Sequence, residues 1–369
     1  MISGMKIGKL TLDGYYNYGN VLQNYALQEV LQRYADLVEH IWHEQDNFMP
    51  RWWWKWSWRT PIRYLLNWRG FRTELKSGFL GMEMVRQGKI KDWCNRYIQM
   101  RDSHGNLSAL ADEYDYFVVG SDQVWNPHFS VLEHCFLDFA PPEKRVAYAA
   151  SISCPVIPED KKHFYEKGTR EMAYISMREQ QGADMVKDFS GRDVPVVVDP
   201  TLLLTPEEWR KVSRQPAWYH GGDYILTYFL GDLPAVLEKL SRETGLPVVN
   251  LLDKHVFEHY VTGPDEFLWA IEHAKLLYTD SFHGAVFAIL FRTPFVVCNR
   301  IGDEVMEKMG SRLDTLLGYF GFEARRGTQA NGYMIANPLS APDWSKVDAV
   351  LAQERARSDE YLRMALHLD

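Results

Sequence analysis

The spacing of hydrophobic and polar residues alternates most clearly between a helical and a strand pattern over residues 263–298. GPDEFLWAIEHA begins with an acidic, proline-led turn and continues with apolar residues at helical spacing, which predicts a helix. AKLLYTD and TPFVVC are short, β-rich runs of the kind found in a buried parallel sheet. SFHG lies between them and leads into the apolar run AVFAIL. The pattern therefore predicts helix, strand, turn, helix and strand in succession.

His283 lies in this predicted turn, directly after a strand and at the start of a helix. Ligands of open α/β sheets bind at the carboxyl edge of the strands, and helix N-termini favour anions. Histidine is also the side chain best suited to proton transfer near neutral pH. A lone histidine in an apolar setting is often structural, so spacing alone leaves both interpretations open.

Similar alternation of strands and helices along the rest of the chain predicts an α/β fold. It is interrupted at residues 214–223, RQPAWYHGGD, a polar connection that predicts a linker between two α/β domains with a cleft between them. A chain of 369 residues also exceeds the size at which one core stops growing. The predicted units are an N-terminal domain at residues 1–210, a C-terminal domain at 220–335, and a helical segment at 341–369 that packs back on a domain.

Candidate ligand-binding residues follow several predicted strands. Gly14 and Gly19, in the loop after a strand at residues 6–12, allow close backbone approach, and a helix from about Asn20 to Tyr34 could turn its N-terminus to an anion or a sugar. A tight connection that binds no ligand would have the same composition.

A second polar turn follows the apolar run at residues 116–119. Asp122 and Gln123 lie there and could orient sugar hydroxyls, whereas Asp122 could equally cap a helix. Arg178 and Asp199 also lie at predicted strand ends.

The composition changes sharply within residues 50–75, which belong to a predicted helical insertion at about 50–105. This stretch holds six of the 13 tryptophans and six Lys or Arg residues against one acid, Glu74. Tryptophan and arginine together suit a membrane interface, so residues 51–72 are a candidate for peripheral membrane contact. The alternative is that the aromatics pack on their own domain or on a second subunit.

Overall composition narrows the class of protein. A hydrophobic content of 46%, a charged content of 24% and a net charge of −8 describe a soluble globular protein and argue against nucleic acid as a partner. The four cysteines lack the spacing of a zinc site, so no metal is expected. We find no signal peptide or spanning segment, which favours a cytoplasmic location. GxGxxG, GxxxxGK[ST], GxSxG and HExxH are absent from the sequence.

Several motifs in a fixed order resemble the polysaccharide pyruvyl transferase family. They are YNYGNVLQNYALQEVLQ, GSDQVWNP at 120–127, DPTLLL, GPDEFLWAIEHAKLLYTDSFHGAVFAILFRTPFVV and SRLDTLLGYFG. The resemblance extends from about Lys6 to Phe322 and is specific as a set. It implies two Rossmann-like domains in a GT-B-like arrangement, and transfer of the pyruvyl group of phosphoenolpyruvate to a sugar hydroxyl pair as a cyclic ketal during cell-surface polysaccharide assembly.

The resemblance also assigns roles to residues. The acceptor would be a lipid-linked or nucleotide-linked sugar, and phosphoenolpyruvate would be a co-substrate, with no resident cofactor. By similarity, His283 is assigned to donor binding or proton transfer. Position at strand ends, helix starts and loops of the predicted cleft completes the set of candidates, with Asp122 beside His283 for catalysis, Ser281, Gly284, Arg312, Arg178 and Arg300 for the donor, and Asn17, Tyr18, Asn20 and Gln123 for the acceptor.

The chain departs from the family pattern at one position. The family's Ser-x-Arg-Leu-His-type motif carries an arginine two residues before the histidine, where this chain has Ser281. Arg312, Arg300 or Arg178 is expected to replace that anion clamp. Two other interpretations stay open: a GT-B-type nucleotide-sugar glycosyltransferase with a diphosphate at residues 281–285, and a non-catalytic partner in a glycan-assembly complex.

Overall fold

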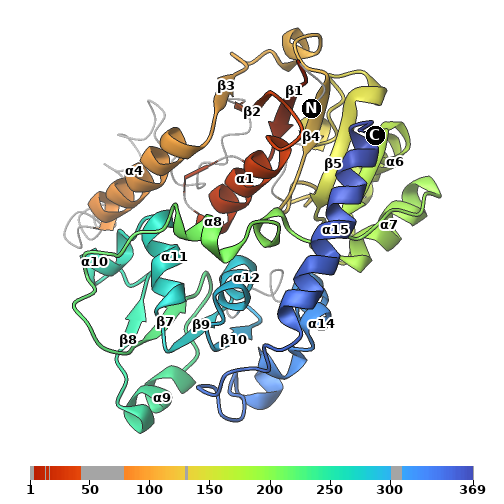
Figure 1. Cartoon of the computed structure of the whole chain (residues 1–369). Coiled ribbons are helices and arrows are strands. Elements are labelled where there is room, and N and C mark those ends of the chain that lie inside the picture. Colours follow the sequence, from red (N-terminus) through yellow and green to blue (C-terminus); the bar gives the residue numbers. More distant parts are fainter. Residues whose placement is uncertain are drawn as a thin grey trace, which may run out of the picture.

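The computed structural model describes residues 4–12, 14–15, 17–42, 79–128, 132–300 and 310–368 (Figure 1). The Trp/Arg-rich stretch at 51–72 lies outside the described residues, and so does much of the predicted insertion at 50–105. Among the described residues, no helix is both long and apolar enough to cross a bilayer.

A six-stranded parallel sheet forms the N-terminal half of the fold, and we call it the first sheet. Its spatial order is β3-β2-β1-β4-β5-β6. All six residues of β5 are buried, because helices cover both faces of such a sheet and favour continuous apolar strands. The strands are β1 (Lys6–Leu10), β2 (Leu37–Trp42), β3 (Met100–Asp102), β4 (Tyr116–Val119), β5 (Arg145–Ala150) and β6 (Tyr174–Met177).

A five-stranded parallel sheet, the second sheet, forms the C-terminal half. Its order is β11-β10-β9-β7-β8. Strands β9 and β10 are the two predicted within residues 263–298, and every residue in them is buried. The strands are β7 (Ile225–Tyr228), β8 (Val248–Asn250), β9 (Leu276–Thr279), β10 (Phe295–Cys298) and β11 (Arg326–Gly327).

Helices surround both sheets, and the largest apolar core is continuous from one half to the other through α1, α11 and α12. This confirms the predicted α/β class with two Rossmann-like sheets in a GT-B-like arrangement. The helices are α1 (Tyr18–Leu31), α4 (Phe79–Tyr97), α5 (Leu132–Cys135), α6 (Lys162–Glu171), α7 (Gln180–Ser190), α8 (Pro206–Arg210), α9 (Val236–Thr244), α10 (Phe257–Tyr260), α11 (Pro264–Glu272), α12 (Phe282–Phe291), α14 (Ser311–Phe320) and α15 (Val347–Ala365).

Two helices begin earlier than the hydrophobic pattern predicts, because polar side chains cap them. Asn17 accepts a hydrogen bond from the Gly19 amide, so α1 starts at Tyr18. Ser281 accepts one from the Gly284 amide, so the predicted SFHG turn is in fact the cap and first turn of α12.

One predicted strand is reduced to a single bridge. The VPVVVDP run pairs with β6 only through Met177 and Val196. Prolines at both ends of the run, Pro195 and Pro200, lack the amide hydrogen that a longer ladder needs.

The C-terminal helix α15 follows the second sheet in the chain but packs against the first half (Figure 1). Tyr361 donates a hydrogen bond to the Ala147 carbonyl in β5, and Arg355 donates to the carbonyls of Leu202 and Leu204. The domain boundaries given above stay a prediction, but these contacts tie the end of the chain to the first sheet.

Replacing Tyr361 with alanine should lower the free energy of unfolding by about 3–5 kcal/mol, because it removes a buried aromatic ring. Tyr361→Phe removes only the hydroxyl and should cost about 1 kcal/mol. Urea unfolding of both variants measures the difference. Equal, small losses would show that α15 is not packed as described.

Candidate functional site

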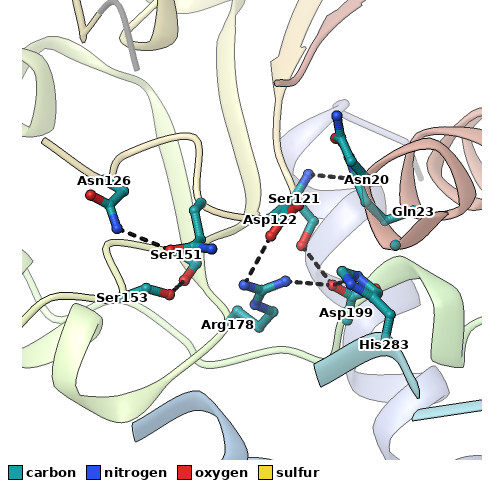
Figure 2. Close-up of polar contacts among 12 residues, drawn as sticks. Asn20, Gln23, Ser121, Asp122, Asn126, Ser151, Ser153, Arg178, Asp199 and His283 are labelled. Atoms are coloured by element: carbon teal, nitrogen blue, oxygen red, sulfur yellow. Dashed lines mark hydrogen bonds and ion pairs between the residues drawn. The ribbon is translucent and has the colours of Figure 1, made fainter. Parts of the chain in front are cut away.

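The carboxyl edges of the two sheets meet at a junction formed by the loops after β1, β4, β6 and β9. Figure 2 shows the polar side chains gathered there. Three contacts bring the halves together: His283 lies against Gly19, His283 approaches Asp199, and Phe282 faces Arg178. The junction is where open α/β folds place their ligands.

His283 occupies the first turn of α12 and is buried. Its Nε2 lies 3.4 Å from Oδ2 of Asp199, and its imidazole ring lies so close to Gly19 that no larger residue fits there unchanged. Ser281, the cap of this helix, and Gly284, which donates to it, are buried beside the histidine. His283 is therefore held in one position by residues of the first half.

Asp199 is the most heavily bonded carboxylate of the junction. Its Oδ2 accepts hydrogen bonds from Arg178 at 2.8 Å and Ser121 at 3.1 Å, and its Oδ1 accepts two from Thr201. Burial alone would raise the pKa of Asp199, but His283 and Arg178 outweigh it and hold that pKa well below its usual range. Asp199 therefore stays a carboxylate beside the histidine.

Arg178, after β6, faces three carboxylates. Asp199 lies 2.8 Å away, Asp122 lies 3.5 Å away and Glu179 lies 3.9 Å away. Burial opposes the charge of Arg178, yet these carboxylates raise its pKa above the usual value. Its guanidinium also stacks 4.5 Å from the ring centre of Phe282. Arg178 is thus fully neutralised by groups of its own half.

Arg312, at the start of α14, is a buried cation without a counterion. Within the described ranges it has no ion pair, and its Nε makes no hydrogen bond. Its guanidinium lies 5.9 Å from the ring centre of Phe282, on which Arg178 also stacks. Burial and the nearby Arg178 lower the pKa of Arg312 to about 10. An anion bound here would relieve both effects.

Arg300, after β10, contributes a further positive charge to this side. Its Nε lies 3.4 Å from Oδ2 of Asp280, whose two oxygens also accept the amides of Leu230 and Gly231. The positive charge of Arg300 is also one of the causes that lower the pKa of Arg312, after burial and Arg178.

The predicted acceptor residues divide into two groups. Asn17 and Asn20 lie at the start of α1, where Asn20 donates to the Leu12 carbonyl, and Gln123 accepts a hydrogen bond from Asn126. Tyr18 is not brought together with them, because it is fully buried and its hydroxyl donates to the Thr262 carbonyl across the two halves.

Asp122 is buried next to Gln123 and adopts a left-handed backbone conformation with φ of 61°. No helix follows it directly, so its carboxylate faces Arg178 and does not cap a helix. The capping interpretation is therefore wrong, and a role for Asp122 in binding or catalysis stays a prediction.

Sequence reasoning did not assign Asp199, Ser121 or Gln23 to the site. Gln23 accepts the Ser121 amide, and Ser121 donates its hydroxyl to Asp199, so a chain of hydrogen bonds runs from α1 to the residue that faces His283 (Figure 2). The DP pair after an apolar run marked Asp199 as a strand-end residue, but nothing in the sequence indicates which histidine it meets.

Replacing Gly19 with alanine should lower the free energy of unfolding by about 1–3 kcal/mol, because the new methyl group overlaps the ring of His283. Gly88→Ala is a matched control in α4, where an added methyl meets nothing within 4 Å. It should raise stability by about 0.5–1 kcal/mol. Thermal or urea unfolding tests both, and a neutral Gly19→Ala would contradict the described contact with His283.

Comparisons with solved structures return distant similarity over the whole chain. UDP-GlcNAc 2-epimerase from Neisseria meningitidis, bound to UDP-GlcNAc, is 8% identical with a TM-score of 0.37, covering 96% of this chain and 100% of that one. UDP-GlcNAc 2-epimerase from Methanocaldococcus jannaschii is 12% identical with a TM-score of 0.39, and the match covers 95% of this chain and 100% of that one. ADP-heptose LPS heptosyltransferase II from E. coli is 12% identical with a TM-score of 0.34, and the match covers 96% of this chain and 100% of that one. TM-scores this low carry no argument about activity.

Comparison with curated proteins returns no match to this chain. The profile of one protein family, by contrast, matches residues 17–301, which include α1, the strands from β2 to β10 and the residues Asp122, Arg178 and His283. This match covers more than half of the chain, and it agrees with the order of motifs along the sequence. The chain belongs to the polysaccharide pyruvyl transferase family.

Proposed function

We propose that this transferase moves the pyruvyl group of phosphoenolpyruvate onto two hydroxyls of a sugar, forming a cyclic ketal during assembly of a cell-surface polysaccharide. The observation that carries the proposal is Arg312, a buried guanidinium with no counterion among the described residues, 5.9 Å from the ring centre of Phe282, which precedes His283 in the chain. A buried unpaired charge is costly, so its presence favours an anionic ligand.

The distribution of charge supports a donor bound from the side of the second half. Arg178 is already matched by three carboxylates, whereas within the described ranges Arg312 has no such partner and Arg300 has one. Phosphoenolpyruvate carries a carboxylate and a phosphate, and the guanidinium fork matches both groups. Arg312 and Arg300 are therefore the better donor ligands, and Arg178 serves to hold Asp199 and Asp122.

Arg312 is also the candidate to replace the arginine that this chain lacks in the family motif. Ser281 stands where the family carries an arginine, and the guanidinium of Arg312 lies over the ring of the next residue, Phe282. A cation from α14 thus reaches the place beside α12 that the motif arginine would serve. Among Arg312, Arg300 and Arg178, we assign the replacement to Arg312.

The chemistry divides into proton transfers and bond exchanges. A proton is added to the methylene carbon of the donor, and one sugar hydroxyl attacks its central carbon and loses its proton. The second hydroxyl then forms the other C–O bond and loses its proton while the bond from that carbon to the phosphate oxygen breaks, releasing inorganic phosphate. His283 is the proposed proton donor to carbon, since Asp199 can hold the imidazolium form that precedes the transfer.

The proposed acceptor side is the loop region of the first half. Gln123, Asn17 and Asn20 carry amide groups suited to sugar hydroxyls, and Asp122 is the proposed base for a hydroxyl proton. Tyr18 is engaged with Thr262, so it supports the start of α1 and does not contact the sugar.

Phosphate release from phosphoenolpyruvate should depend on a glycosyl acceptor, and His283→Ala should lower its rate by about 10²–10⁴-fold. His255→Ala, at an exposed histidine, is the control and should leave the rate unchanged. The assay uses a panel of lipid-linked and nucleotide-linked sugars. Transfer from a nucleotide sugar without consumption of phosphoenolpyruvate would overturn the proposal in favour of a glycosyltransferase.

Replacing Arg312 with methionine should separate binding from stability. Loss of its charge should raise KM for phosphoenolpyruvate by about tenfold or more, since a hydrogen bond to a charged group is lost. The melting temperature should not fall, because an unpaired buried charge is removed. Arg210→Gln, at an exposed arginine of α8, is the charge control. An unchanged KM would exclude Arg312 from the donor site.

We also propose that residues 51–72 contact the membrane at its cytoplasmic face, where a lipid-linked acceptor would be found. Six tryptophans and a strong local positive charge motivate this. Deletion of residues 51–69 should weaken binding to anionic vesicles in a sedimentation assay while leaving the melting temperature nearly unchanged. Equal vesicle binding by the intact and shortened proteins would refute it.

A further inference from the structure

The first turn of α14 carries polar groups without partners. Gly310, which precedes the helix, supplies no side-chain cap, and the first amides of a helix have no partner within it. The hydroxyl of Ser311 is buried and makes no hydrogen bond among the described residues, and neither does Nε of Arg312. Arg312 is only 8% exposed, so its unpartnered state is a real cost.

Arginines from two further elements approach this turn. Nη2 of Arg326, in β11, lies 3.0 Å from the position that a Cβ on Gly310 would occupy, and its Nε bonds to Asn299 at 2.9 Å. Arg300 follows Asn299 directly in the chain, and its positive charge contributes to the lowered pKa of Arg312. The start of α14 thus has the guanidinium of Arg326 beside Gly310, and Arg312 is in its first turn.

The carboxylates near the turn, among the described residues, have other partners or are exposed. Asp314 lies 3.5 Å from Nη1 of Arg326 but is 71% exposed, and Asp280 is engaged with two backbone amides as well as with Arg300. Asp122 and Glu179 of the first half also act on Arg312, but both are close to Arg178. The described residues therefore balance the positive charge at the start of α14 only in part.

The start of α12, which the sequence favours as the anion site, is already satisfied in part. Ser281 accepts the Gly284 amide at 3.2 Å, and the Ser281 amide donates to Oγ1 of Thr279 at 3.0 Å. A phosphate placed there would compete with these bonds. At α14 the cap is Gly310, which has no hydroxyl, and the hydroxyl of the next residue, Ser311, makes no hydrogen bond to the described part of the chain.

We propose that the start of α14 is a subsite for a phosphate dianion, formed by Ser311, Arg312 and Arg326. This turn would offer a phosphate three kinds of donor: its backbone amides, the hydroxyl of Ser311 and the guanidiniums of Arg312 and Arg326. Its assignment to the donor rests on the proposed function: the subsite holds the phosphate of phosphoenolpyruvate and then the inorganic phosphate that leaves. The pyruvyl carbons would then lie toward His283.

The test places a competing charge at the subsite without weakening the helix. Gly310→Asp adds a carboxylate at a helix cap, which favours the helix but repels phosphate, and Gly310→Asn adds a neutral cap of nearly the same size. Binding of inorganic phosphate is measured by titration calorimetry, and folding by thermal unfolding. We expect Asp to raise the Kd at least about tenfold more than Asn, with no loss of melting temperature in either variant.

Ser311→Ala provides a second measurement that removes a single hydroxyl. It should raise the Kd for phosphate about five- to tenfold, as expected for loss of a hydrogen bond to a charged ligand, whereas Arg210→Gln should leave it unchanged. Phosphate binding that is undetectable in the unmodified protein, or equal in all variants, would overturn the subsite.

Comparing KM for phosphoenolpyruvate with the Kd for inorganic phosphate shows whether the donor phosphate uses the subsite. If the donor phosphate uses the subsite, KM for phosphoenolpyruvate rises in parallel with the Kd for inorganic phosphate in Ser311→Ala and Gly310→Asp. A raised Kd with an unchanged KM would overturn the donor assignment. Failure of the proposed function would give a different result from failure of the subsite. In that case inorganic phosphate would still bind at α14, but phosphoenolpyruvate would not be consumed with any acceptor.

Discussion

The buried carboxylate of Asp199 is the interaction on which the junction depends. Burying an isolated charge costs several kcal/mol, and only well-placed partners offset that cost. Asp199 finds them in Arg178 and Ser121 of its own half and in His283 of the other. Because its partners come from both halves, the position of the histidine and the relative placement of the two sheets are set by the same group.

Carboxylates of the first half neutralise Arg178, so the arginines of the second half are the ones available to an anionic ligand. The carboxylates that hold Arg178 belong to the loops of the first sheet, whereas Arg312 and Arg300 extend from α14 and β10 with little opposing charge. The junction is therefore electrostatically asymmetric. An acidic protein can still bind an anionic donor, because local rather than net charge decides the field at a buried site.

Hydrophobic pattern predicted the fold well but placed helix starts poorly. Continuous apolar runs are sufficient to locate β9 and β10, since a buried parallel strand needs little else. The start of α12 was missed because a cap depends on one hydroxyl, that of Ser281. The pairing of Asp199 with His283 joins residues 84 positions apart, and the isolation of Arg312 depends on which carboxylates fold elsewhere. Neither is encoded in local spacing.

The return of α15 to the first sheet has a mechanical consequence. The chain crosses between the halves twice, once after α8 and again before α15, so the halves are doubly tethered. These two connections join halves that also share a continuous apolar core. Separating the sheets would therefore pull on both connections at once and expose that core to water, so the two tethers and the core act together to keep the junction closed.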